Sequence, residues 1–268
     1  MTYKALTIAG SDSGGGAGIQ ADLKTFQELD VYGMSVITAL TAQNTLGVQG
    51  VHPVPVEFVS EQLQSIADDL EPDALKTGML FSAEIIETVA NHVKKHKWTR
   101  LIVDPVMIAK GGASLLQQEA VKALQEKLLP SAYVVTPNIP EAEVLTGVVI
   151  QSEEDRKKAA IKLYQMGAEH VVIKGGHNED KAVSVDLHYD GSQFHTFKGR
   201  RFETKHTHGT GCTFAAVITA EVAKGHSVQA AIGTAKEFIT AAIENELGIG
   251  SGHGPTNHWA YRKAGVRT

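Results

Sequence analysis

A cysteine follows two glycines at the start of a predicted helix. Residues 209–213 read Gly-Thr-Gly-Cys-Thr, and helical periodicity continues to residue 223. Because Gly209 and Gly211 expose successive backbone N–H groups at a helix N-terminus, the segment predicts an anion site. Cys212 would lie in the first helical turn, where the positive helix end lowers the pKa of a thiol. A thiolate here could be a nucleophile or could accept a proton from an alcohol, and the flanking glycines argue against a buried, inert cysteine.

Two carboxylates follow predicted strands. Asp104 ends the apolar run 100–104, where a buried charge is costly unless it meets a cation such as Mg²⁺ or hydrogen-bond donors; the alternative is a surface aspartate that caps the next loop. Glu141 follows the run 133–136 across a turn in which Asn138 can cap a helix, and such capping alone explains an isolated glutamate. Together, two carboxylates at neighbouring strand ends suit a Mg²⁺ ion that also takes phosphate oxygens.

A lysine and a glycine-rich loop also follow predicted strands. Lys174 ends the run 170–174 before the glycines 175–176, so it could reach a polyphosphate for which the glycine backbone leaves room. Alternatively, its side chain could extend from the strand end into solvent. The loop 10–18 has glycines that let a backbone approach a ligand closely, and we interpret it as a ligand loop. It lacks the Gly-Lys-Ser/Thr of a P-loop and the glycine spacing of a dinucleotide fold. Asp22, one turn into the next helix, could contact a substrate hydroxyl or only offset the helix dipole.

The predicted elements explain how these residues could meet. Short β-rich runs alternate with longer helical stretches, which predicts a mostly parallel sheet covered on both faces, with a ligand crevice at the carboxyl ends of the strands. After residue 182, short runs around a turn at 190–191 predict antiparallel hairpins, and the tail from residue 248 is expected to be irregular. Strands are expected at 4–9, 35–42, 74–78, 100–104, 133–136, 170–174, 183–189, 193–197 and 201–204, and helices at 20–29, 56–68, 83–95, 115–128, 140–146, 153–166, 213–223 and 228–246.

Composition narrows the classes of protein that fit. The chain has 268 residues without an internal repeat or a composition break, which predicts a single domain over 1–268. A formal net charge of -5, without a basic stripe interleaved with aromatics, argues against a nucleic-acid partner. Cys212 is the one cysteine, which excludes an intramolecular disulfide and a cysteine-cluster metal site, and His206 and His208 have no third ligand at a recognisable spacing. No signal-peptide pattern and no apolar run of about 20 residues occur, so no membrane partner and a cytoplasmic location are expected.

These segments, in this order along the chain, resemble those of the ribokinase-like superfamily and, within it, of the hydroxymethylpyrimidine/phosphomethylpyrimidine kinases of thiamine biosynthesis. Asn-x-Pro-Glu at 138–141 and Gly-Thr-Gly-Cys at 209–212 are specific when they occur together. The resemblance implies a three-layer α/β/α sandwich whose central sheet is mostly parallel with a short antiparallel portion. It also implies a homodimer that uses ATP and Mg²⁺ to phosphorylate 4-amino-5-hydroxymethyl-2-methylpyrimidine and then its monophosphate. The other matching segments are 5–12, 16–26, 42–45, 104–107, 136–137, 174–177 and 206–208.

The resemblance assigns roles to particular residues. Cys212 matches the base that deprotonates the substrate hydroxymethyl group, and the backbone of Gly209, Thr210 and Gly211 matches the anion hole for the transferred phosphoryl group. Such a reaction needs positioning and charge stabilisation more than covalent chemistry. Gln43 matches the residue that binds the aminopyrimidine ring, and its amide offers both a donor and an acceptor. The remaining matches are Asp104 and Glu141 for magnesium, Asn138, Lys174, Thr210 and Gly211 for the nucleotide, and Asp22, Gly10, Met79 and Val106 for the substrate pocket.

Three other functions remain open at this point. A pyridoxal kinase of the cysteine-containing type shares nearly all these motifs, although Gln-Asn-Thr at 43–45 favours the pyrimidine. Cys212 could also be the nucleophile of a hydrolase or acyltransferase, which would leave Asp104, Glu141 and Lys174 unexplained. A nucleotide-binding regulator without catalytic activity is the third alternative.

Overall fold

Strands and helices alternate along most of the chain, as the periodicity predicts. The computed structural model describes residues 2–107, 118–175 and 183–265. In chain order the elements are β1 (Lys4–Asp12), α1 (Gly18–Glu28), β2 (Tyr32–Asn44), β3 (Gly47–Pro53), α2 (Val56–Asp69), β4 (Ala74–Thr77), α3 (Ala83–Lys95), β5 (Leu101–Val103), α4 (Gln118–Ala123), η1 (Leu124–Leu128), η2 (Leu129–Ser131), β6 (Val134–Val135), α5 (Ile139–Thr146), α6 (Glu153–Gln165), β7 (His170–Ile173), β8 (Val183–Tyr189), β9 (Phe194–Arg200), α7 (Thr210–Ala223), α8 (Val228–Glu244) and α9 (Ala260–Lys263).

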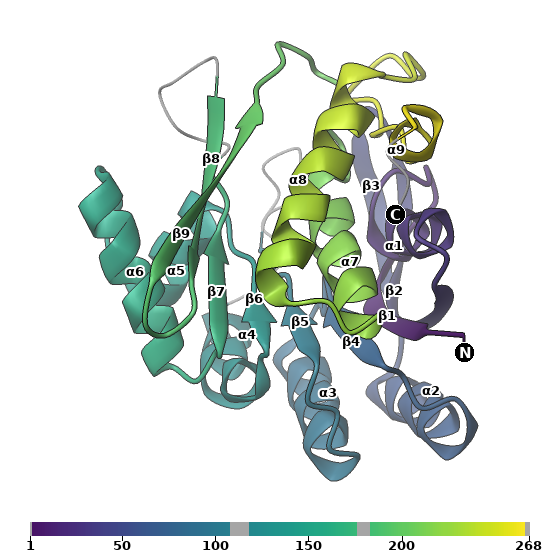
Figure 1. Ribbon diagram of the computed structural model, residues 1–268. Helices are drawn as coiled ribbons and strands as arrows, with labels where there is room; N and C mark the ends of the chain where they lie inside the picture. The colour runs from purple at the N-terminus through teal and green to yellow at the C-terminus, as the bar shows by residue number, and fades with distance from the viewer. Residues whose placement is uncertain (1, 108–117, 176–182, 266–268) are drawn as a thin grey trace.

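One sheet runs through the molecule in the order β3-β2-β1-β4-β5-β6-β7-β8-β9 (Figure 1). The six central strands β2, β1, β4, β5, β6 and β7 run parallel to one another. At one edge β3 pairs antiparallel with β2, and at the other β8 pairs antiparallel with both β7 and β9. The parallel strands all end at the same edge of the sheet, which is where ligands bind in open α/β folds. The expected three-layer sandwich with a mostly parallel sheet is therefore confirmed.

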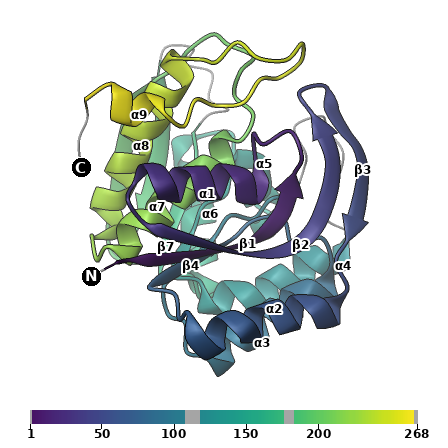
Figure 2. The same ribbon diagram turned by 90° about the vertical axis from the view of Figure 1, so that its right-hand side faces the viewer.

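Two helical layers enclose the sheet. Apolar side chains of α2 to α6 pack on one face, and those of α1, α7, α8 and α9 pack on the other (Figure 2). Because successive strand residues point to opposite faces, Leu101 and Val103 join the first layer while Ile102 joins the second. This explains why the strands read as continuous apolar runs.

Helix α7 is buried along almost its whole length. Every residue from Thr213 to Ala223 is buried, because the helix lies between α8 and the strands β1, β4 and β5. A helix that is apolar on all sides is typical of such a central position. Its N-terminus is consequently fixed at the carboxyl end of the sheet.

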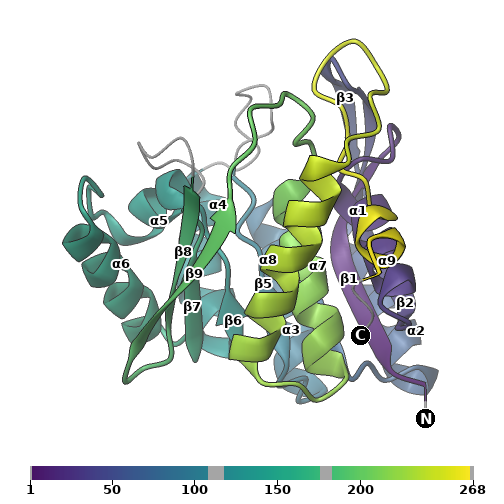
Figure 3. The ribbon, with the colours of Figure 1, turned by 45° about the horizontal axis from the view of Figure 1, so that its top comes forward.

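Three features differ from the sequence-based expectations. The edge strand β3 was not predicted, because most of its residues are exposed and no apolar alternation marks it. The run 201–204 forms no strand, and the tail contains the short helix α9. Residues 115–117 of a predicted helix lie outside the described residues. Figure 3 shows the tail beside the tip of the β2–β3 hairpin, where the His253 N–H donates to the Thr45 carbonyl at 2.8 Å.

A histidine cluster on β7, β8 and β9 predicts acid sensitivity. Burial lowers the pKa of His188 to about 4, below the 6.5 expected in the unfolded chain. His170 Nδ1 lies 3.1 Å from His188 Nε2, and the rings of His188 and His195 stack. Since His188 binds a proton more readily in the unfolded chain, its contribution to the free energy of unfolding is fully present above pH 6.5. This contribution is lost as the pH falls towards 4. Urea unfolding should therefore give a lower free energy of unfolding at pH 5 than at pH 7. This difference between the two pH values should be smaller for the His188→Gln protein.

The matched change at an exposed histidine provides the control. His52 is exposed on β3. His52→Gln is expected to leave the difference between the two pH values unchanged. An equal loss of stability in the native and His188→Gln proteins would contradict the assignment to this cluster.

Candidate active site

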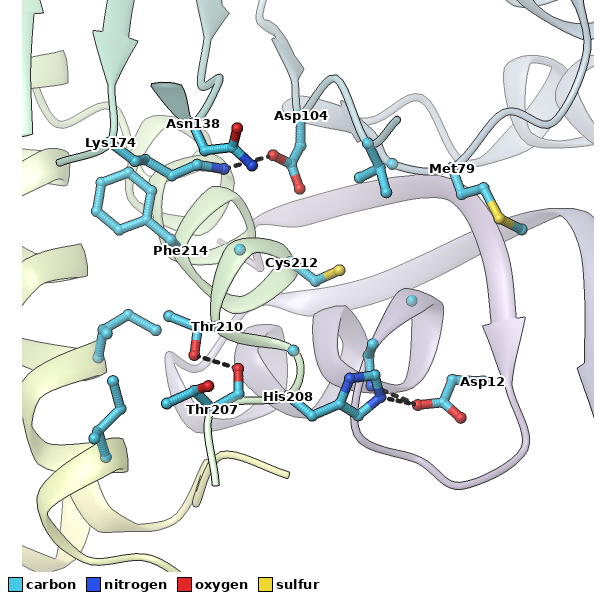
Figure 4. Close-up of a pocket in the computed structure, with 18 of the residues that line it drawn as sticks. Asp12, Met79, Asp104, Asn138, Lys174, Thr207, His208, Thr210, Cys212 and Phe214 are labelled. Atoms are coloured by element: carbon cyan, nitrogen blue, oxygen red, sulfur yellow. Dashed lines mark hydrogen bonds and ion pairs between the residues drawn. The ribbon is translucent and has the colours of Figure 1, made fainter. Parts of the chain in front are cut away.

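A pocket of about 730 Å³ opens at the carboxyl edge of the sheet. It lies where β1, β4, β5, β6 and β7 end and where α1, α5 and α7 begin (Figure 4). The strand ends indicated by the sequence thus surround one pocket. The predicted site residues that line the pocket are Gly10, Gln43, Met79, Asp104, Val106, Asn138, Glu141, Lys174, Gly209, Thr210, Gly211 and Cys212.

The loop before α7 is held against the glycine-rich loop before α1. Gly209 has a φ of 84°, and a Cβ on it would lie 1.8 Å from the Gly16 carbonyl oxygen. Only glycine tolerates both the backbone angle and this approach. The Thr210 hydroxyl donates to the Thr207 carbonyl at 2.8 Å, and within the described residues no side chain caps α7. The Thr210 N–H donates to the Thr207 carbonyl at 3.3 Å, while residues 209–212 line the pocket. The start of α7 therefore faces the pocket, where an anion can bind.

Cys212 lies in the first turn of α7, and Figure 4 shows its sulfur directed away from the helix into the pocket. Burial raises the pKa of the Cys212 thiol to about 12, although the Lys76 ammonium opposes this increase. The expectation that the pKa of Cys212 lies below its ordinary value is therefore wrong. Burial is the largest cause of the increase, and the nearby carboxylates of Asp22 and Asp104 add to it.

An acidic and basic cluster lies on the opposite wall. Asp104 is 2% exposed, and its Oδ1 atom accepts a hydrogen bond from Lys174 Nζ at 2.9 Å. Asn138 and Glu141 form a capping box at the start of α5, with backbone-to-side-chain bonds of 2.8 and 2.9 Å. Burial raises the pKa of Glu141 to about 7, with Asp104 adding to the increase and Lys174 opposing it. The capping interpretation of Asn138 and Glu141 is correct, and both residues also face the pocket.

The donor set of this wall fits a magnesium ion that is shared with a nucleotide. Asp104 and Glu141 supply carboxylate oxygens, and a bound cation would offset the burial, and the lesser repulsion from Asp104, that raise the pKa of Glu141. In the described part of the chain, no group of three or more His, Cys, Asp or Glu side chains could hold a metal ion by itself. Magnesium commonly takes one or two carboxylates and completes its coordination with phosphate oxygens and water, so these residues suit it.

The wall that carries Gln43 is formed by the ends of β1 and β2. The Gln43 amide lies 3.2 Å from His208 Nε2, and its Oε1 atom accepts a hydrogen bond from the Thr41 hydroxyl at 3.2 Å. Gly10 and Met79 meet here, since a Cβ on Gly10 would lie 2.4 Å from the Met79 methyl group. A planar heterocycle could therefore contact Gln43 at its edge and apolar side chains on its face.

Two residues of this wall were not predicted, Asp12 and His208. His208 Nε2 lies 2.9 Å from Asp12 Oδ2, and Asp12 also accepts backbone N–H bonds from Gly14, Gly16 and Ala17. Burial would raise the pKa of Asp12, but the bonds from His208 and the backbone hold it below its ordinary value. An aspartate two to five residues before glycines is a known turn signal, and it could have identified Asp12.

Two sequence-based interpretations need correction. Asp22 does not line the pocket: it is fully buried, and its carboxylate is paired with Lys76 and Thr7, so it makes no direct substrate contact in this arrangement. Gly175 does not leave room for a polyphosphate. A Cβ there would lie 1.8 Å from the Val185 carbonyl oxygen, so the glycine permits the close approach of β8. Residues 176–177 lie outside the described residues.

The fold and the pocket are those of a ribokinase-like kinase of small molecules. A family model described as phosphomethylpyrimidine kinase matches residues 12–257. The chain belongs to this family.

Individual relatives agree with this assignment. A hydroxymethylpyrimidine/phosphomethylpyrimidine kinase of Bacillus subtilis is 61% identical, covering 99% of this chain and 98% of its own. An enzyme of the same description from Haemophilus influenzae is 57% identical, covering 96% and 97% of the two chains. The solved pyridoxal kinase of Staphylococcus aureus in complex with AMP-PCP and pyridoxal is 42% identical, with a TM-score of 0.90 over 98% of this chain and 96% of its own. The relatives are kinases, which removes the support for the hydrolase and regulator alternatives.

Proposed function

We propose that the protein uses ATP to phosphorylate 4-amino-5-hydroxymethyl-2-methylpyrimidine and then its monophosphate in thiamine biosynthesis. The observation that carries the proposal is one pocket lined by Gln43, Lys174 and the Cys212 thiol at the start of α7. Figure 4 shows Lys174 on one side of Cys212 and His208, the neighbour of Gln43, on the other. The names of the relatives at 57% and 61% identity support the same substrate class.

The residues of the pocket divide the work between binding and charge stabilisation. The Gln43 amide binds a ring nitrogen and the neighbouring amine, which directs the hydroxymethyl group towards α7. The hydroxyl oxygen forms the new bond to phosphorus while the bond to the leaving oxygen of ADP breaks. The backbone N–H groups of Gly209, Thr210 and Gly211 stabilise the negative charge of the phosphoryl group during transfer.

Cys212 accepts the hydroxyl proton in this proposal. A thiol whose pKa is about 12 must first release its own proton to solvent, so the groups that stabilise the thiolate belong to the catalytic apparatus. In phosphoryl transfer the attacking oxygen bonds only weakly to phosphorus at the transition state. The base therefore does not have to remove the hydroxyl proton before that point. A thiolate that makes up only a small fraction of the Cys212 side chains can therefore suffice.

Nucleotide and metal would be held at the wall of Asp104 and Lys174. ATP supplies the phosphoryl group, and magnesium neutralises charge on its phosphates. Asp104 and Glu141 would hold the metal ion, while Lys174 and Asn138 would contact phosphate oxygens. The buried position of Asp104 keeps its carboxylate in one orientation for this purpose.

Lys174→Met is expected to weaken ATP binding about 10- to 100-fold, the effect of losing one hydrogen bond to a charged group. Calorimetric titration with ATP and magnesium measures this directly. Lys224, which pairs with Glu221 at 2.7 Å far along α7, provides the matched control. Lys224→Met should bind ATP normally, and normal binding by Lys174→Met would contradict the phosphate role.

Pyridoxal phosphorylation is the second candidate function. The structural similarity to a pyridoxal kinase at a TM-score of 0.90 favours it as a side activity. We expect kcat/KM to be higher for the hydroxymethylpyrimidine than for pyridoxal when both are measured with the same enzyme preparation. A higher value for pyridoxal would overturn the choice of substrate.

We also propose a homodimer located in the cytoplasm. The β2–β3 hairpin exposes Leu40, Leu46 and Val51 beside β3, the edge strand of the sheet that the described residues form, and such an edge is a natural place for self-association. The single free cysteine is compatible with a reducing compartment. Within the described ranges, no helix is long and apolar enough to cross a membrane. Sedimentation of the purified protein would test the dimer.

A further inference from the structure

A buried ion pair lies beneath the pocket and has no part in the contacts proposed so far. Lys76 of β4 and Asp22 of α1 are both excluded from solvent, and Lys76 Nζ lies 2.8 Å from Asp22 Oδ2. The Thr7 hydroxyl donates to the same carboxylate oxygen at 2.6 Å. The other oxygen of Asp22 has no hydrogen-bond partner within the described residues.

Stability alone does not explain this pair. Removing two charges from water is costly, and apolar residues of similar volume are often as stable or more stable in the same position. A carboxylate oxygen left without a donor adds to that cost. Buried charges beside a ligand pocket are therefore candidates for a role in its chemistry.

The ammonium group of Lys76 lies directly behind the pocket wall. Gly78 lines the pocket just after β4, and a Cβ on Gly78 would lie 3.4 Å from Lys76 Nζ. No side chain at this position separates the charge from the pocket. Helix α7, which carries Cys212, packs against β4. The positive charge is thus fixed beneath the site of the reaction.

The charges around the Cys212 thiol give Lys76 a specific effect. Burial acts most strongly and raises the thiol pKa, and Lys76 is the strongest of the groups that lower it, ahead of the Gly18 N–H. Burial alone would lower the pKa of Lys76, but the neighbouring negative groups raise it, so the ammonium is retained. The charged groups that interact with the thiol are Lys76, Asp22, Asp104 and Lys174.

We propose that Lys76 is a positioning residue of the active site: held by Asp22, its ammonium stabilises the Cys212 thiolate that accepts the substrate proton. This inference rests on the base role proposed for Cys212. Lys76 does not touch the substrate, and it acts through the thiol. Asp22 acts one step further away, since it keeps the ammonium charged and in place.

Alkylation of Cys212 tests the inference without any kinase assay. The chain has one cysteine, so the reaction with iodoacetamide reports on this thiol alone. The thiolate is the species that reacts, and the rate between pH 7 and pH 9 therefore follows the thiolate population. In Asp22→Asn/Lys76→Met, neutral side chains of similar size replace both charges. We expect about threefold slower alkylation at each pH, because the lost ammonium lowers the thiol pKa more than the lost Asp22 carboxylate raises it.

Two further variants separate charge from disturbance of the fold. Lys76→Arg keeps the positive charge and should react at close to the native rate. Glu221→Gln/Lys224→Met removes the ion pair of 2.7 Å at the other end of α7 and should also react normally. A native alkylation rate in the folded Asp22→Asn/Lys76→Met protein would overturn the inference, and so would an equal loss in Lys76→Arg or in the α7 control. Because the readout is independent of turnover, failure here is distinguishable from failure of the proposed function.

Discussion

Cys212→Ala is expected to lower turnover by about 10²–10⁴-fold, the range typical of general-base removal. Alanine cannot accept the hydroxymethyl proton, whereas the nucleotide wall formed by Asp104 and Lys174 is unchanged. Steady-state kinetics at saturating ATP and pyrimidine measure the loss. Calorimetric titration of the same variant with ATP should give the native affinity.

Cys212→Ser distinguishes the proton acceptor from a group that only fills space. Serine keeps approximately the size of the side chain, but its hydroxyl ionises far less readily than a thiol, so we expect a loss close to that of the alanine variant. Near-native turnover of Cys212→Ala would contradict the base role, while leaving the fold and the family assignment intact.

Gly209→Ala is expected to lower turnover by at least about 10²-fold, the effect of losing one donor of an anion hole. The residue has a φ of 84°, and the added Cβ would lie 1.8 Å from the Gly16 carbonyl oxygen. The loop before α7 would have to move, which would displace the N–H groups that hold the phosphoryl charge. Turnover with saturating substrates measures the effect.

Gly233→Ala is the matched control for this change. Gly233 lies within α8, and a Cβ there would meet nothing within 4 Å among the described residues. Alanine in a helix interior stabilises by about 0.5–1 kcal/mol, so this variant should unfold at higher temperature with native turnover. Native turnover of Gly209→Ala would contradict the anion-hole assignment.

The layered fold could be predicted because its signals are local. Apolar runs on β5 and β7 mark strands buried on both faces, and Ser82 and Ser152 mark the starts of α3 and α6 with capping bonds that the structure contains. Strand β3 carries no such signal. It is exposed, and it is a strand only because β2 pairs with it.

The site could be predicted as far as strand ends and helix starts determine it. Asp104, Lys174 and Cys212 each follow a strand or begin a helix, and parallel topology brings these positions together. The partner of Asp22 could not be predicted in this way, because Lys76 is 54 residues away in the chain and its side chain points beneath the pocket. Long-range pairings of buried charges leave no local pattern.

The pKa of the Cys212 thiol also could not be predicted from the sequence. A helix N-terminus is visible in Gly-Thr-Gly-Cys, but the burial of Cys212 and its distances from Asp104 and Lys76 depend on the folded chain. Burial reverses the direction that the helix end alone would give. The local motif therefore predicts the place of the reaction better than the protonation state of its cysteine.

The mass of the product formed from the hydroxymethylpyrimidine tests the central claim most directly. The purified protein is incubated with ATP, magnesium and 4-amino-5-hydroxymethyl-2-methylpyrimidine, and ATP consumption is followed beside the mass spectrum. We predict a product with one added phosphate followed by one with two, and neither product with the Cys212→Ala protein over the same period. Unchanged pyrimidine in the presence of native protein and ATP would contradict the account.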